Sequence, residues 1–419
     1  METASNRPPN KPIPTGIRST IFSLLLAAAA LANTSPQDST LIQGINGFGF
    51  EMLSRFANRD TTGNILLSPL GLSSALTLVA NGAKGNTAAE IRGMLGQTAI
   101  DPATVTGFHA KALSALVDSS SGVYCRFSNS IWWKQSLPVE KTYLDANTRP
   151  FRAHMQAIDL PGPRGMEIVN GWVSKETRNR IPKLLGTPLA SDASMALAQA
   201  MFFRGYWAGG LWSVTDGVGF KGQDGTVSEC RMLLLQPFGE HSRRFARLDS
   251  LRILELPYGD SLYSMVLVTP DSGRRSQDLV AGLTPDIWDV WLDFLRPHTG
   301  VVASFPAFSI TTDGSLDSTL AELGMQSVFD RAGADFSPMS RDRALSLSLV
   351  THSTAIEVDV ERNKNIKRIQ GRHRAMWSGK VTRVSESFRA DRPFLFAVRE
   401  RRSGLIVLLG LVRDPGRKG

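Results

Sequence analysis

The chain has 419 residues, of which 42% are hydrophobic and 20% are charged, and its formal net charge at pH 7 is +9. This composition is typical of a globular protein with ample material for a core, and it excludes collagen-like, coiled-coil and repeat classes. No apolar run reaches the roughly 18 residues that a membrane-spanning helix requires.

The first 32 residues contain the three parts of a secretory signal peptide. Arg7, Lys11 and Arg18 precede a short apolar core, and Ala30-Leu31-Ala32 is typical of a cleavage site. We therefore expect residues 1–32 to be removed and the protein to be secreted into the extracellular space. An N-terminal helix and an uncleaved anchor are the alternatives.

Helices are the main prediction for the first half of the chain. Apolar residues recur at helical spacing over three segments, 39–58, 72–83 and 168–185. Asn86-Thr87 and Glu90 predict the cap and the first turn of a further helix. Three shorter runs predict strands, at 64–69, 127–134 and 195–205, and the last of these is apolar on both faces.

Strands are the main prediction for the second half. Their patterns lie at 251–256, 263–269, 301–310, 394–399 and 405–412. Pro306 interrupts the third of these, and residues 316–325 predict a helix. Because helices and strands come in mixed order and do not alternate regularly, the sequence predicts an α+β class with large antiparallel or mixed sheets.

The sequence contains no motif of an enzyme, a metal site or a cofactor site. Its six histidines form no HExxH pattern, and there is no P-loop, no GxSxG elbow and no GxGxxG that opens a helix. We therefore expect a non-enzymatic protein with no metal and no cofactor. Cys125 and Cys230 match no metal motif, and the sequence leaves open whether they pair or remain thiols.

A long basic segment lies near the C-terminus. Residues 362–383 carry eight lysines and arginines, and no carboxylate lies between Glu361 and Glu386. Such concentrated charge favours a sulfated glycan or an acidic protein surface as a partner. Nucleic acid is disfavoured because Trp377 and Phe388 are the only aromatic residues near this charge.

At several points the sequence resembles the serpins, the serine protease inhibitor superfamily. The residues that carry the resemblance are Asn64–Pro69 with Ser73–Leu76, Gly82–Thr87, Phe202–Trp207, Leu254–Tyr258, Ala334–Ser337 and Phe388–Phe396. They are collinear and span about residues 40–415. The resemblance implies a serpin fold with three β-sheets, a large central sheet A, about nine helices and an exposed reactive-centre loop. It also implies one domain over 33–419, with the loop at about 361–387.

The resemblance implies protease inhibition as the function. Inhibitory serpins offer the loop as bait, and the cleaved loop inserts as a new central strand of sheet A. The resemblance assigns the shutter and breach beneath this strand to five residues: Ser68, Ser73, Gln199, Trp207 and His352. Gln199 stands where the family has asparagine, and a hydrogen bond to His352 is expected there. A satisfied core histidine is the alternative.

The loop hinge departs from the family pattern. The resemblance places it at Val360, Glu361, Arg362, Asn363, Lys364, Asn365, Ile366 and Lys367. Inhibitory serpins have glycine at the position of Arg362, followed by threonine and alanines. Alternate strand side chains face opposite sides, so Asn363, Asn365, Lys367 and Ile369 would point into the core. Burying an unpaired amide costs about 1–3 kcal/mol, and an unpaired lysine costs several more. This predicts slow insertion and a poor or non-inhibitory serpin.

Two alternatives remain beside the prediction of a poor or non-inhibitory serpin. The family spacing does not fix the scissile bond. It gives a candidate region that includes Met376, Gly379, Lys380, Val381, Thr382 and Arg383, and a cut after Lys380 or Arg383 would suit a trypsin-like protease. The chain is then a working inhibitor with a basic residue before the cut. Alternatively, it is a polyanion-binding module that uses Lys364, Lys367, Arg368, Arg372, Arg374, Lys380 and Arg383. We expect a monomer in each case.

Overall fold

The computed structural model describes residues 35–117, 122–208, 211–236, 243–271, 275–342, 345–359 and 384–417. In these residues it contains nine α-helices, one 3-10 helix and three β-sheets of seven, five and four strands. The expected α+β fold with three sheets and about nine helices is confirmed. The signal peptide expected at 1–32 lies outside the described residues.

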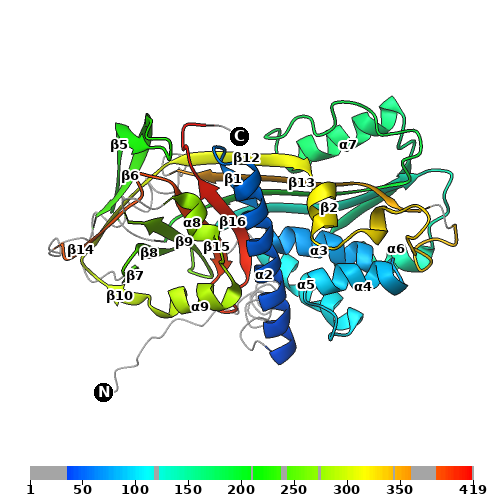
Figure 1. Ribbon diagram of the computed structural model, residues 1–419, viewed down its shortest axis with the longest axis horizontal. Helices are drawn as coiled ribbons and strands as arrows, with labels where there is room; N and C mark the ends of the chain where they lie inside the picture. Colours follow the sequence, from blue (N-terminus) through cyan, green and yellow to red (C-terminus); the bar gives the residue numbers. More distant parts are fainter. Residues whose placement is uncertain are drawn as a thin grey trace, which may run out of the picture.

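The seven-stranded sheet forms the core of one half of the molecule (Figure 1). Its order is β1(Ile65–Leu67), β16(Ile406–Val412), β15(Phe394–Glu400), β9(Tyr263–Pro270), β8(Leu251–Pro257), β7(Arg243–Arg247) and β10(Arg296–His298). All neighbours in this sheet run antiparallel. β15 and β16 are buried at every residue, so the last two strands lie between layers.

The five-stranded sheet extends into the other half. Its order is β12(Phe308–Ser315), β13(Leu347–Val358), β4(Met195–Gly205), β2(Val123–Lys134) and β3(Ala153–Ile158). The four-stranded sheet has the order β14(Glu386–Arg389), β11(Val301–Pro306), β6(Val227–Gln236) and β5(Leu211–Lys221). The single strand predicted over 301–310 is therefore two strands, and Pro306 marks the point where the chain passes from one sheet to the other.

Helices cover both faces of the five-stranded sheet (Figure 1). The helices are α2(Pro36–Arg59), α3(Pro69–Ala80), α4(Gly85–Met94), α5(Pro102–Val117), α6(Lys141–Asn147), α7(Pro163–Glu176), α8(Ser276–Val280), α9(Pro285–Asp293) and α10(Asp317–Glu322), and η2(Ser327–Phe329) is the 3-10 turn. α7 packs on alanines 196, 198 and 200 of β4. α3 packs on the opposite face, against Leu197. β4 is thus buried on both faces, as its apolar run predicts.

Several helix boundaries differ from the predictions, and α4 and α7 are two examples. α4 begins at Gly85 after Lys84, and Asn86 lies inside the helix, where its amide donates to Glu90 at 2.7 Å. α7 ends at Glu176, well before residue 185, because the next turn leaves helical geometry. Arg178 and Asn179 have φ angles of +54° and +59°, a left-handed conformation that non-glycine residues seldom adopt.

Candidate functional site: the seam between β4 and β13

The site centres on the seam where β4 and β13 pair in parallel. The pairing extends from Leu347 beside Met195 to Glu357 beside Arg204. β13 ends at Val358, just before the basic segment, and β14 in the four-stranded sheet begins at Glu386, just after it. The two ends of the segment are therefore fixed in different sheets. All the hinge, scissile and polyanion-binding residues predicted between 360 and 383 lie outside the described residues.

Ser68 and His352 meet in the middle of the seam. The Ser68 amide donates to His352 Nε2 at 3.0 Å, and the Ser68 hydroxyl donates to the Val407 carbonyl at 2.7 Å. Because a backbone amide can only donate, Nε2 must be the unprotonated nitrogen of a neutral ring. His352 is 2% exposed, and burial lowers its pKa to about 3. Thr354 Oγ1 lies 2.8 Å from the same nitrogen.

Gln199 lies opposite His352 in the strand pairing but does not bond to it. Gln199 is fully buried, and neither of its amide atoms has a hydrogen-bond partner among the described residues. The expected bond between Gln199 and His352 is therefore absent. A Cβ added at Gly71 would lie 2.8 Å from Gln199 Cδ, so the glycine at this position leaves room for the glutamine. Ser73 is also fully buried, and its hydroxyl has no partner in the described chain.

Further polar residues of this cluster were not predicted. Asn129 on β2 pairs with Gln199 across the strands, and its amide donates to Ser74 Oγ at 3.1 Å. Thr354 is two residues beyond His352, so strand alternation places both on one face of the sheet. That alternation could have identified Thr354 from the sequence. Nothing local to Asn129 indicated that it faces α3.

Trp207 closes the end of the seam nearest the basic segment. Its ring stacks on Tyr258 with centroids 4.5 Å apart, and the edge of Phe305 packs against it at 5.8 Å. Trp207 and Tyr258 also form an isolated β-bridge beyond the end of β4. Aromatic pairs of this kind stabilise by about 0.5–1.5 kcal/mol beyond the burial of their area. This packing holds the end of the five-stranded sheet against the other two sheets.

Charged side chains connect β13, β4 and the end of α7. Glu357 on β13 forms ion pairs with Arg204 on β4, at 3.8 Å, and with Arg180, which follows α7. Arg178, in the left-handed turn before Arg180, places its guanidinium 4.3 Å from the ring centroid of Tyr124 on β2. The turn after α7 therefore contacts both sides of the seam, which would have to separate before another strand could enter.

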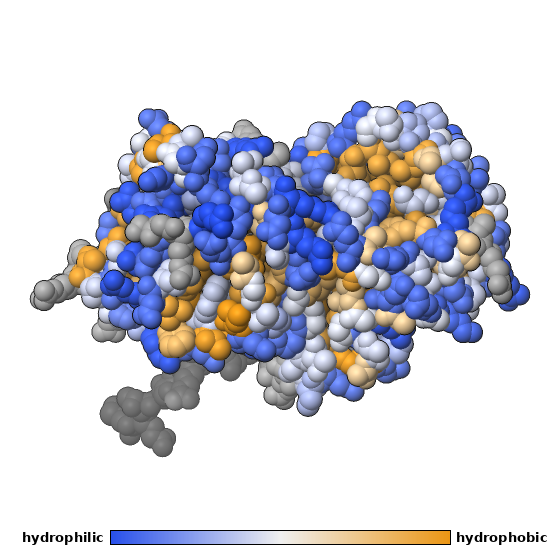
Figure 2. Space-filling model, in the orientation of Figure 1, coloured by the Kyte–Doolittle hydropathy of each residue, from blue (hydrophilic) through white to orange (hydrophobic). Residues whose placement is uncertain are grey.

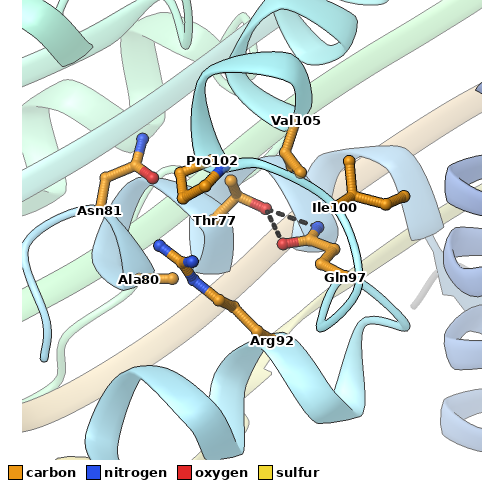
Figure 3. Close-up of a pocket in the computed structure, with 8 residues that line it drawn as sticks. All are labelled: Thr77, Ala80, Asn81, Arg92, Gln97, Ile100, Pro102 and Val105. Atoms are coloured by element: carbon orange, nitrogen blue, oxygen red, sulfur yellow. Dashed lines mark hydrogen bonds between the residues drawn. The ribbon is translucent and has the colours of Figure 1, made fainter. Parts of the chain in front are cut away.

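A pocket lies away from the seam, between the end of α3, α4 and the start of α5 (Figure 3). Thr77 and Gln97 form its floor and are hydrogen bonded to each other at 2.9 Å. Arg92 projects into it from α4, and an adjoining hollow of about 540 Å³ reaches α6. None of the predicted site residues lines either space. His109 contacts Thr77 at 3.3 Å behind the floor, and burial lowers its pKa to about 3.

Three other features are absent from the residues that the structure describes: a metal site, a membrane-spanning helix and a disulfide bond. In the ranges that the structure describes, no group of histidine, cysteine or acidic residues could hold a metal ion. No helix in the described part of the chain is long and apolar enough to cross a membrane. Cys125 and Cys230 are free thiols, and burial raises the pKa of each.

Comparisons with known proteins agree with this geometry. The family model described as "Serpin (serine protease inhibitor)" matches residues 43–415. "Intracellular coagulation inhibitor 1" of Tachypleus tridentatus is 29% identical over 399 residues, which cover 93% of this chain and 90% of that protein. "Leukocyte elastase inhibitor" of Xenopus tropicalis is 28% identical and covers 88% of this chain and 97% of its own length.

Two solved structures share the fold. Native protease nexin-1 with heparin superposes with a TM-score of 0.77 at 21% identity, covering 91% of this chain and all of that chain. The mouse protein-Z dependent protease inhibitor superposes with a TM-score of 0.78 at 22% identity, covering 90% of this chain and 98% of that chain. The family match over nearly the whole chain decides the classification, and this protein belongs to the serpin family.

Proposed function

We propose that this chain is a secreted, non-enzymatic, monomeric serpin whose reactive-centre loop inserts poorly, so that trypsin-like proteases cleave it more readily than it traps them. The observation that carries this proposal is the lining of the seam. On its core side, Phe203 of β4 pairs with Ile356 of β13, and both side chains are fully buried. An inserted strand would place its first inward residues between such apolar partners.

The hinge sequence fits this lining badly. Asn363, Asn365 and Lys367 are the residues that alternate inward in the family frame. Each buried amide without a partner costs about 1–3 kcal/mol, and a buried lysine without an anion costs several more. Arg362 also lacks the backbone freedom of the glycine that inhibitory serpins have there. Trapping competes with release of the cleaved chain, so slow insertion favours release.

Trypsin digestion followed by denaturing electrophoresis and a thermal melt tests the proposal. We expect cleavage within 362–383, no SDS-stable adduct, and a melting temperature that changes little after the cut. The hinge variant Arg362→Gly with Asn363→Thr, Asn365→Ala and Lys367→Ala should form the adduct and gain stability on cleavage. The matched control, Arg372→Ala with Arg374→Ala, removes charge beyond the hinge and should behave as the parent chain. An adduct with the unmodified chain would contradict the proposal.

A working inhibitor is the second candidate, and Gln199 favours it. Its two amide atoms are buried without partners. The inward residues of an inserted strand would pass this point, and an amide or ammonium group there could bond to Gln199. Relief of an unsatisfied buried group is worth about 1–3 kcal/mol, which would offset part of the hinge cost. Replacing Gln199 with leucine should then slow adduct formation, whereas it should have no effect on a chain that never inserts.

Polyanion binding is a third candidate. The eight basic residues of 362–383 nearly account for the net charge of +9, and one structural neighbour was solved with heparin. Retention on a heparin column should fall as salt rises, and it should be lost in a chain whose residues Lys367, Arg368, Arg372 and Arg374 are replaced by serine. Retention that survives this change would place the basic surface elsewhere.

Secretion is proposed from the N-terminal pattern alone. Expression in animal cells should release a chain that begins near residue 33, as N-terminal sequencing of the medium would report. Retention of the intact chain within the cell would refute this part of the proposal. It would leave the loop argument unchanged, because the seam does not involve residues 1–32.

A further inference from the structure

An apolar stripe lies along the outer side of α9. Five large hydrophobic side chains are exposed in the part of the chain that the structure describes, and Ile287, Val290 and Phe294 are three of them. Their spacing of three and four residues places them on one side of the helix and its end, with half-buried Trp291 between them. Figure 2 shows orange surface at the lower left, where Figure 1 places α9.

α9 cannot rotate to bury this stripe, because another side of the helix already contacts the core. Trp288 is 1% exposed and Leu292 is 8% exposed. The Trp288 ring lies 5.7 Å from the ring of Phe50 on α2. The Thr284 hydroxyl caps the helix by accepting from the Ile287 amide at 3.3 Å. The stripe is therefore a fixed feature of the surface, and contiguous exposed apolar residues mark interaction sites.

A row of carboxylates borders the stripe. Successive helical residues turn by roughly 100°, which places Asp286, Asp289 and Asp293 in one sector between the buried side and the apolar stripe. All three are exposed, and α9 contains no lysine or arginine. Asp289 accepts a hydrogen bond from Gln43 at 2.8 Å. Arg296, just beyond the helix, directs its guanidinium to backbone carbonyls at the helix end.

The charge of this surface selects among possible partners. Within the described segments, the ion pairs involve neither Asp286 nor Asp293, and both side chains are exposed, so a partner's cations can reach both carboxylates. Anionic lipid surfaces and nucleic acid would be repelled by it. A protein segment with apolar anchors beside a row of lysines or arginines would complement both the stripe and the row.

We infer that α9 and Phe294 form a docking surface for a basic, apolar-anchored segment of a partner protein. The apolar anchors pack on Ile287, Val290, Trp291 and Phe294, and the partner's cations face the aspartates. This surface lies outside the β4–β13 seam, so its use does not depend on whether the reactive-centre loop inserts. It belongs to a part of the fold that the inhibitory mechanism leaves unexplained.

A labelled peptide tests the inference with the full chain. The probe is a fluorescein-labelled 14-residue helix of leucines along one side and lysines on one flank, and the control peptide has glutamates in place of the lysines. Fluorescence anisotropy should show binding of the lysine peptide that weakens as salt rises, and much weaker binding of the glutamate peptide. Ile287→Ser and Phe294→Ser should each weaken binding by about tenfold.

Matched variants distinguish binding at this surface from non-specific hydrophobic binding. Val227 on β6 is 68% exposed, more than any residue of the stripe, so Val227→Ser should leave the affinity unchanged. Asp286→Asn with Asp293→Asn should reduce the affinity and remove most of its salt dependence. Equal loss with Val227→Ser, or equal binding of the two peptides, would overturn the inference. A dimer in light scattering that Phe294→Ser converts to monomer would also overturn it.

Discussion

Because two histidines are buried, we expect acid to destabilise this protein at pH values well above those at which carboxylates titrate. His109 and His352 are both fully or almost fully buried, and burial lowers the pKa of each to about 3, from an ordinary value of 6.5. Above pH 6.5 both are neutral in the folded and the unfolded chain, so they contribute no pH dependence. Between pH 6.5 and 3 only the unfolded chain takes up their protons, so the free energy of unfolding falls as the pH falls.

The size of this effect follows from the pKa difference. Each pH unit inside the window costs up to about 1.4 kcal/mol per histidine. Lowering the pH from 7 to 5 should therefore cost roughly 2 kcal/mol for each ring and roughly 4 kcal/mol for both. That is a large share of a typical folding stability of about 5–15 kcal/mol. Glu255, whose pKa is lowered, adds its effect at still lower pH.

Guanidinium unfolding at pH 7, 6 and 5, followed by tryptophan fluorescence, measures the slope. His109→Leu should halve the slope, because it removes one of the two titrating rings. Leucine suits this position, since the His109 ring packs on Phe108 and Phe151 and its Nδ1 has no partner in the described chain. An exposed control, His154→Gln, should leave it unchanged. A midpoint that stays constant between pH 7 and 5 in the parent chain would refute the reasoning, since it would mean that these rings titrate normally.

Three substitutions probe other contacts. Glu255→Gln should lower the free energy of unfolding by about 3–5 kcal/mol, because buried Arg399, which lies 2.7 Å from the Glu255 carboxylate, would lose its anion. A loss below about 1 kcal/mol would show that the pair is not needed. Glu357→Gln removes partly exposed ion pairs, so its cost should be only about 0.5–1 kcal/mol, but hydrogen exchange along β4 and β13 should quicken; unchanged exchange would mean that Arg180 does not hold the seam. Gln199→Met should stabilise the native chain by about 1 kcal/mol, because it removes two unsatisfied buried atoms, and a lower melting temperature would contradict this.

The sequence predicted elements best where one local pattern decides the structure. The run at 195–205 became β4, because a strand covered on both faces needs apolar residues at every position. The segment at 39–58 became α2, whose capping box at Ser35 and Asp38 reinforces the helical spacing. The fold class and the family followed from these patterns and from the collinear motifs.

Features that depend on distant contacts were not predictable in the same way. The helix expected to reach residue 185 ends at Glu176, because Arg178 and Asn179 adopt left-handed geometry with no glycine to announce it. Contacts with Tyr124 and with the end of α7 accompany that turn. The orientation of the Gln199 amide likewise depends on Gly71, which is far away in the sequence. Neither contact leaves a local signal.

The strands on either side of the basic segment belong to two different sheets. One end continues from β13, which pairs with β12; the other end enters β14, which pairs with β11 from Val301–Glu386 to Ser304–Arg389. β11 and β12 are separated only by Ala307, so the four strands and the segment form a closed ring of chain and hydrogen bonds. An intact ring transmits displacement of either end to both sheets. A single peptide-bond cleavage within the segment opens the ring and lets one end move while the other stays paired.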